Sequence, residues 1–164
     1  MAQSRKKASN PRKGKQDRSL FDRLNQFFQQ HQNKVLVAAL LLTVLFSFLL
    51  FNFNVSLMGD DGAYIKRAYR LLNYGDFPSF QGPFYPFVLS FFIWIFGLNV
   101  TLLKALSGIF ILGHLWFFYK ALKDRIPAVL YIFAIVVIAT NAYMVSHSSW
   151  TFSEALFMFL QAAL

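Results

Sequence analysis

Long apolar runs separated by short polar segments make up most of the chain after residue 34. The clearest run covers residues 35–53 and is interrupted only by Thr43, Ser47 and Asn52. Nineteen helical residues at a rise of 1.5 Å extend for roughly 28 Å, which matches the hydrocarbon core of a bilayer. The pattern therefore predicts a first transmembrane helix over 35–53.

The next apolar run, residues 83–97, is too short to predict a crossing. It has fifteen residues and opens with Gly82-Pro83, a pair that is typical of turns. A crossing needs about 20 apolar residues, so an interfacial or re-entrant helix is the better interpretation. A first juxtamembrane helix is predicted before it, ending at Tyr74.

Two later runs are long enough to span a bilayer, and another begins near the end of the sequence. We predict a second transmembrane helix over 99–119, a third over 128–145 and the start of a fourth over 155–164. A basic loop, 120–127, and a polar loop, 146–154, separate them.

The positive-inside rule decides on which side these loops lie. The loop 120–127 is basic and is therefore expected in the cytoplasm. That placement requires residues 83–97 to stay outside, which makes 54–98 one external loop and 146–154 another. If residues 83–97 crossed the membrane, the basic loop would lie outside instead.

The N-terminal 34 residues are basic rather than apolar. Residues 1–34 hold nine Lys or Arg and two Asp, which gives +7 of the net charge of +9. A basic arm can bind nucleic acid, but this one leads directly into an apolar run. We therefore expect a cytoplasmic tail near anionic lipid headgroups and no nucleic-acid partner. Apolar residues at helical spacing within it predict a short amphipathic helix at the membrane surface: Leu20, Phe21, Leu24, Phe27 and Phe28.

Composition supports the same class of protein. Hydrophobic residues make up 57% of the 164 residues and charged residues 14%, and the mean hydropathy is positive, which excludes a soluble globular domain. The chain has no Cys, so disulfides, thiolate metal sites and cysteine nucleophiles are excluded. The predicted fold class is an all-α integral membrane protein: a polytopic helical bundle with amphipathic juxtamembrane helices in its first external loop.

Two adjacent carboxylates beside a basic helix are the candidate chemistry of the chain. Asp60 and Asp61 precede a segment whose helical spacing puts Lys66, Arg67 and Arg70 on one face. One acid would deprotonate an acceptor hydroxyl while the cations hold the phosphate of an anionic lipid. The alternative is structural, because an acid at this position also caps a helix and offsets its dipole.

The spacing in this loop resembles that of one large enzyme family. Gly59-Asp60-Asp61-x-x-Tyr64-x-x-x-Ala68 is followed by Leu71-x-x-x-Gly75, Gly82-Pro83-x-Tyr85-Pro86 and Phe96-Gly97. The pattern is similar to the first external loop of the polytopic, lipid-sugar-dependent glycosyltransferases of the C-type fold. That family includes protein O-mannosyltransferases and lipid A aminoarabinose transferases. The resemblance covers roughly residues 35–164 and implies a cytoplasmic N-terminus and two external juxtamembrane helices.

The resemblance implies roles for individual residues and makes Asp60, Asp61 and Glu154 the candidate catalytic residues. Asp60 matches the family's catalytic acid, Asp61 its acidic neighbour and Tyr64 the aromatic residue that follows. Glu154 lies where the family places an acid at the top of the helix after the second external loop. From the residues alone, Glu154 also completes a capping box with Thr151, and the two roles are compatible.

The implied reaction is the inverting transfer of a sugar from a polyprenyl-phosphate donor to an acceptor hydroxyl on the external face of the membrane, with Asp60 as general base. Lys104 is expected near the external boundary, where it binds phosphate or snorkels. The implied partners are membrane lipid, the lipid-linked sugar donor and an acceptor glycan, lipid or protein, in a bacterial inner (plasma) membrane. The candidate donor phosphate-binding residues are Lys66, Arg67, Arg70 and Lys104.

No set of metal ligands is predicted, and the cofactor stays unknown. Asp60 and Glu154 could share a divalent cation, since hard cations prefer carboxylate oxygen, but the sequence does not require one. His147 stands near Trp150 in the second external loop, where a lone histidine is more often structural than a base or a ligand. His114 lies within a predicted span, where ionisable residues normally face other helices or an aqueous cavity.

Other classes of function stay open. Enzymes of this family have many more spanning helices, so we expect this chain to be a fragment that is inactive by itself. A non-catalytic membrane assembly subunit would use the external acids only as helix caps. A transporter fragment would place Lys104 and His114 on a substrate path, but no internal repeat typical of transporters is visible in the sequence.

Overall fold

The computed structural model describes residues 19–54, 60–79 and 82–164, and the regular structure within these ranges is helical throughout. This confirms the all-helical architecture for the described residues. Most of the predicted basic tail, residues 1–18, and Gly59 of the motif lie outside them. The elements are α1 (Leu20–Leu49), α2 (Asp60–Tyr74), α3 (Phe84–Phe96), α4 (Val100–Leu122), α5 (Ala128–Thr140), α6 (Ala142–Ser146), the 3-10 helix η1 (His147–Ser149) and α7 (Ser153–Ala163).

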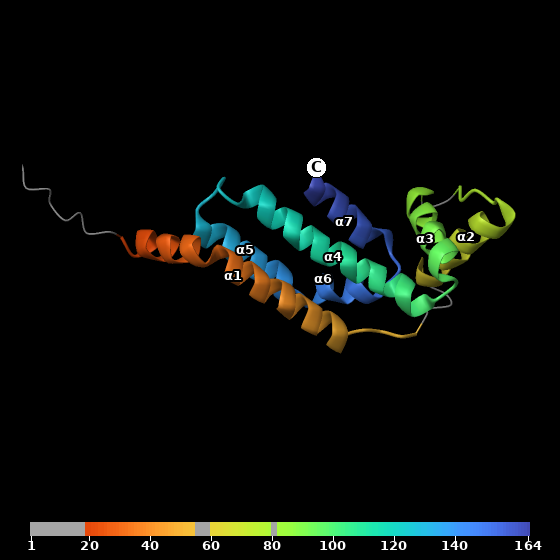
Figure 1. Cartoon of the computed structure of the whole chain (residues 1–164), viewed down its shortest axis with the longest axis horizontal. Helices are drawn as coiled ribbons and strands as arrows, with labels where there is room; N and C mark the ends of the chain where they lie inside the picture. Colours follow the sequence, from red (N-terminus) through yellow and green to blue (C-terminus); the bar gives the residue numbers. More distant parts are fainter. Residues whose placement is uncertain (1–18, 55–59, 80–81) are drawn as a thin grey trace, which may run out of the picture.

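The helices α1, α4, α5 and α7 form a bundle in which successive members run in opposite directions, and α2 and α3 lie at one end of it (Figure 1). α1 and α5 run toward that end, whereas α4 and α7 run away from it. α2 and α3 pack on each other there, and α3 does not run along the bundle. The segment predicted to be the first external loop thus carries a helical hairpin, α2–α3.

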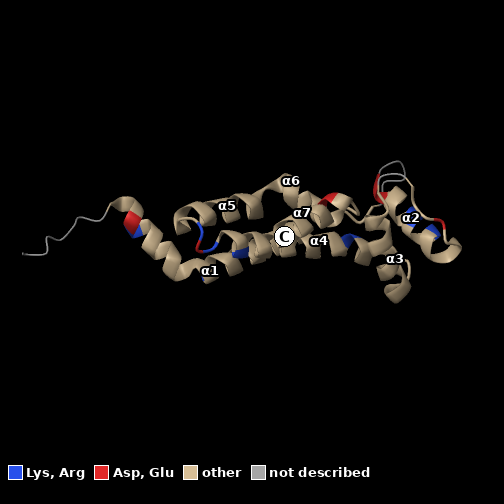
Figure 2. Cartoon of the chain, turned by 90° about the horizontal axis from the view of Figure 1, so that it is seen from above, with Lys and Arg blue, Asp and Glu red and all other residues tan. Residues whose placement is uncertain are grey.

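α1 joins two elements that the sequence pattern kept apart. A capping box holds its first turn, because the Ser19 hydroxyl accepts a hydrogen bond from the Asp22 amide and the Asp22 carboxylate accepts one from the Ser19 amide. The predicted amphipathic helix continues without a break into the predicted span, and α1 changes direction along its length (Figure 2). It ends at Leu49, and residues 51–54 are not helical.

Within the described part of the chain, two helices are long and apolar enough to cross a membrane, α1 and α4. A third span arises only if α5 and the α6–η1 segment count as one, and these are bent by 50°. The third transmembrane helix predicted over 128–145 is therefore divided in two, and whether it crosses stays a prediction. Asn141 interrupts it, because its backbone is extended and its side chain accepts a hydrogen bond from the Met144 amide at 3.1 Å, which starts α6 as a new helix.

Two clusters of buried side chains hold the helices together. The first lies between α1, α4 and α5 and includes Leu36 and Leu115. The second joins the α2–α3 hairpin to α4 and α7 and includes Tyr64 and Leu156. Large apolar side chains are also exposed on the outer faces of the bundle, such as Phe133 on α5, and an apolar surface of this kind suits a lipid environment.

Candidate acidic site at one end of the bundle

Asp61 lies at the centre of contacts that join distant segments of the chain. It is only 4% exposed, although it belongs to the first turn of α2. One carboxylate oxygen accepts hydrogen bonds from the Thr151 backbone amide, at 2.7 Å, and from the Thr151 hydroxyl. The other oxygen lies 3.1 Å from the ammonium nitrogen of Lys104. Both oxygens of Asp61 are therefore engaged within the protein.

Lys104 supplies the positive charge from near the start of α4. It is 1% exposed, and its ammonium also donates hydrogen bonds to the backbone carbonyls of Asn52, at 2.9 Å, and Asn54. Burying an ammonium is costly unless it is paired and hydrogen-bonded, and here three oxygens surround it. This differs from the expectation that Lys104 binds the donor phosphate or snorkels, because its charge is used inside the protein.

Thr151 bonds to Asp61 and not to the helix that it was expected to cap. α7 begins at Ser153, and the residue at its N-cap, Phe152, makes no side-chain capping bond. The predicted capping box between Thr151 and Glu154 is therefore wrong. Thr151 is fully buried, so its hydroxyl needs a partner in the interior, and the Asp61 carboxylate provides one.

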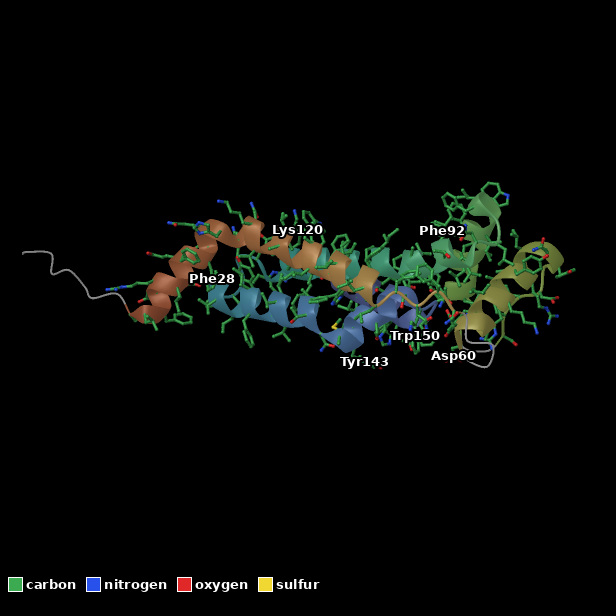
Figure 3. The ribbon with its side chains drawn as sticks, turned by 90° about the horizontal axis from the view of Figure 1, so that it is seen from below. Phe28, Asp60, Phe92, Lys120, Tyr143 and Trp150 are labelled. Carbon is green, nitrogen blue, oxygen red and sulfur yellow. The ribbon has the colours of Figure 1, made fainter. Side chains whose placement is uncertain are left out.

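Asp60 and Glu154 are exposed, in contrast to Asp61. Each lies in the first turn of its helix, α2 or α7, where the helix dipole favours a negative charge. The Asp61–Thr151 contact brings the starts of these two helices to the same end of the bundle. Figure 2 shows acidic residues at both helix starts there, and Figure 3 shows Asp60 near Trp150, which closely precedes α7.

Tyrosine and serine hydroxyls connect the hairpin to the rest of the bundle beside this contact. The Tyr64 hydroxyl lies 3.2 Å from that of Ser153, and the Tyr85 hydroxyl lies 3.3 Å from that of Ser107. The two tyrosine rings meet edge to face, with 5.1 Å between their centroids. Burial raises the pKa of Tyr85 above its ordinary value, and the hydrogen bond with Ser107 opposes this only in part, so the hydroxyl stays protonated.

The basic face of α2 is largely exposed, as its spacing predicted. Arg70 forms an ion pair with Asp76, with 2.6 Å between nitrogen and oxygen, and the Arg67 guanidinium lies 5.9 Å from the centre of the Tyr64 ring. Lys66 is exposed on the same helix. An open hollow of about 370 Å³ lies beside this face, and its lining consists of Arg67, Arg70, Asp76, Phe77, Pro78 and Ser79.

The basic segment between α4 and α5 lies at the other end of the bundle from the acids (Figure 2). Lys120 belongs to the last turn of α4, and Arg125 lies in the connection to α5. The bundle therefore separates these cations from Asp60 and Glu154 along its length.

The two histidines considered from the sequence make contacts with backbone carbonyls. His114 Nδ1 lies 2.9 Å from the carbonyl of Met158 on α7, and His147 Nδ1 lies 2.7 Å from that of Tyr143. His147 also stacks on Trp150, with 6.2 Å between the ring centroids. The part of the chain that the structure describes contains no group of three or more His, Cys, Asp or Glu side chains that could hold a metal ion.

Thr151 and the carbonyls of Asn52 and Asn54 were missed as parts of this site. A signal for them existed, because Lys104 sits in an apolar sequence and must find an opposite charge and further acceptors. The sequence therefore predicts that Lys104 has partners, but it does not identify them. Backbone carbonyls in particular leave no trace in the sequence.

No protein-family model matches the chain, and neither does any curated protein or any solved structure. The resemblance to the C-type glycosyltransferases therefore stays a prediction that rests on the motif residues. The geometry adds an independent fact, which is that two exposed acids from distant parts of the sequence lie at one end of the bundle.

Proposed function

We propose that this chain belongs to a membrane glycosyltransferase that transfers a sugar from a polyprenyl-phosphate donor to an acceptor hydroxyl on the external face of the membrane. The observation that supports it best is the Asp61–Thr151 contact. This contact places Asp60 and Glu154 at the same end of the bundle, beside the basic face of α2. An acid that serves as base and cations that hold a phosphate are the groups that this reaction needs.

The proposed topology is a polytopic helical bundle in a bacterial inner membrane with a cytoplasmic N-terminus. α1, α4 and the bent α5–α6 pair cross the membrane, and the α2–α3 hairpin lies at its outer surface. The positive-inside rule then puts the connection between α4 and α5 in the cytoplasm. The separation of this basic connection from the acids along the bundle supports the topology.

Asp60 is the general base in this proposal. Its carboxylate takes the proton of the acceptor hydroxyl, the acceptor oxygen bonds to the anomeric carbon, and the bond from that carbon to the donor phosphate breaks with inversion. The polyprenyl phosphate leaves with the electron pair. Lys66 and Arg67 are the cations nearest to Asp60 in the sequence and offset the charge of the leaving group, whereas Arg70 already shares its charge with Asp76.

Asp61 and Lys104 hold the site and do not react in this proposal, because their charged atoms are buried against each other. The catalytic role first expected of Asp61 and the phosphate-binding role expected of Lys104 are therefore not retained. Glu154 is the second exposed acid, available to the acceptor or to a divalent cation.

Replacing Asp60 by Asn in the full-length protein tests the base. We expect transfer from radiolabelled polyprenyl-phosphate mannose, or from its aminoarabinose counterpart, to fall by at least about 10²-fold, because general-base catalysis contributes roughly 10²–10⁴-fold. Asp124→Asn is the matched control, since Asp124 lies in the basic connection and Asn tolerates its positive φ of 68°. Transfer that survives Asp60→Asn would exclude the base role.

A non-catalytic membrane assembly subunit is the second candidate. The observation that favours it is that Asp61, one of the two acids of the motif, makes structural contacts with both oxygens. If Asp60 were likewise only a partner of the helix dipole, Asp60→Asn would change stability and leave transfer intact. The same measurement therefore separates the two candidates.

A further inference from the structure

Asp61 and Lys104 are the charged side chains that are buried among the described residues. Their charged atoms are 3.1 Å apart, and the side chains are 5% and 1% exposed. A buried charge without its partner is far more costly than a matched pair, because desolvation is then uncompensated. Each of the two side chains is therefore stable in its place only while the other is present.

The contacts of this pair join four segments at the acidic end of the bundle. Lys104 belongs to α4 and holds the carbonyls of Asn52 and Asn54 in the non-helical segment after α1. Asp61 belongs to α2 and holds Thr151 in the segment before α7. Asp60 directly precedes Asp61, and Thr151 lies three residues before Glu154, so the pair sets the position of both exposed acids.

We infer that Lys104 is a positioning residue, and that its ion pair with Asp61 is a clasp that holds the α2–α3 hairpin and the segment before α7 against α4. The inference goes beyond the transferase proposal and applies whatever reaction Asp60 performs. Loss of one charge releases the clasp, because the remaining charge draws water into the interior. Loss of both charges leaves no unpaired buried charge, so the α2–α3 hairpin and the segment before α7 stay in place.

Thiol accessibility measures the clasp directly, because the chain has no Cys. Ser149→Cys is the reporter, since Ser149 is 1% exposed and lies two residues before Thr151. Ala139→Cys reports on the first buried cluster, in which Ala139 is 1% exposed, and Trp150→Cys gives the labelling rate of an exposed site. The full chain in membranes is treated with N-ethylmaleimide, and the extent of labelling is measured over time by mass spectrometry.

We expect slow labelling of Ser149→Cys in the otherwise unchanged chain. In the backgrounds Lys104→Met and Asp61→Asn, the rate should rise by at least about tenfold, because each leaves one buried charge without its partner. In the double background Lys104→Met with Asp61→Asn, the rate should fall back to within about threefold of the parent, since no buried charge is left unpaired. Lys104→Arg keeps the charge and should also protect the reporter.

Ala139→Cys should stay protected in all these backgrounds, which distinguishes release of the clasp from unfolding of the chain. Exposure of Ala139→Cys by either single change would mean that the whole chain unfolds, and would overturn the inference of a local clasp. Single changes that leave Ser149→Cys protected would overturn it. So would a double variant that labels as fast as the product of the two single effects, because the residues would then act separately.

Discussion

Thr151 and Asp61 lie ninety positions apart in the sequence, yet the Thr151 amide donates a hydrogen bond to the Asp61 carboxylate at 2.7 Å. The Thr151 hydroxyl donates to the same oxygen. Through this one carboxylate, the first turn of α2 and the approach to α7 are fixed to each other. The position of the two exposed acids therefore depends on Thr151, which has no catalytic role in the proposed reaction.

Thr151→Val should destabilise the protein by about 1–3 kcal/mol, because it removes the buried hydroxyl donor and leaves a carboxylate oxygen with one hydrogen bond fewer. Thr151→Ser keeps the hydroxyl and should cost less. Thr140→Val is the matched control, since the Thr140 hydroxyl bonds at 2.8 Å to the carbonyl of Val136 in its own helix and is exposed. Urea unfolding of the protein in mild detergent, monitored by circular dichroism, measures the difference. Equal effects at both positions would contradict the role assigned to Thr151.

The two glycines of α4 should respond differently to alanine. A Cβ added at Gly113 would lie 2.6 Å from the ring of Phe159 on α7, whereas one at Gly108 would meet the Ser148 carbonyl at 3.4 Å. Gly113→Ala should therefore destabilise the packing of α7 by about 1–3 kcal/mol. Gly108→Ala should be neutral or stabilising, because alanine favours a helix by about 1 kcal/mol over glycine.

Shortening the opposing ring tests the cause of the Gly113 effect. Phe159→Leu should recover part of the stability lost in Gly113→Ala, since the clash is with the Phe159 ring. Thermal unfolding of the single and double variants gives the coupling. Purely additive effects would show that the glycine matters for another reason.

The exposed ion pair between Arg70 and Asp76 should contribute little to stability. Its side chains are 56% and 47% exposed, and solvent-exposed pairs contribute about 0–1 kcal/mol. Arg70→Gln should thus shift the unfolding midpoint slightly, and raising the salt concentration should remove even that difference. A loss as large as that of breaking a buried pair would mean that Arg70 and Asp76 support the fold.

Single-cysteine labelling tests the proposed topology in intact cells. Ser79→Cys and Trp150→Cys should react with a membrane-impermeant maleimide, whereas Arg125→Cys should not, because the connection between α4 and α5, which holds Arg125, lies at the opposite end of the bundle. All three should react after the cells are broken. Labelling of Arg125→Cys from outside, with Ser79→Cys protected, would reverse the orientation. Labelling of both from outside would mean that α4 does not cross.

Hydrophobic periodicity predicted most of the helices and their order. The starts of α4 and α7 fall within about two residues of the predicted positions, because apolar runs and a capping Asn99 mark them. The break at Asn141 was missed, since one polar residue inside an apolar run does not reveal that its side chain will cap a new helix. The sequence analysis also missed that the amphipathic helix and the first span form one helix, α1. Ser19 and Asp22 have the spacing of a capping box and mark its start.

The site was predicted less completely than the fold. Sequence spacing identified Asp60, Asp61, Glu154 and Lys104 as the groups of interest, but it could not show that two of them neutralise each other in the interior. That outcome depends on how α2 packs against α4, which no local pattern records. Periodicity tells which residues are buried; it does not tell which buried charge meets which.

The clasp also has a consequence for biogenesis. Asp61 leaves the ribosome well before Thr151, and at a synthesis rate of about 5–20 residues per second the ninety intervening residues take roughly 5–18 seconds. Lys104 follows Asp61 by 43 positions and Thr151 by ninety, so the carboxylate lacks its Thr151 hydrogen bonds and depends on water until the end of that interval. The α2–α3 hairpin therefore reaches its final contacts late, in a docking step that waits for the segment before α7.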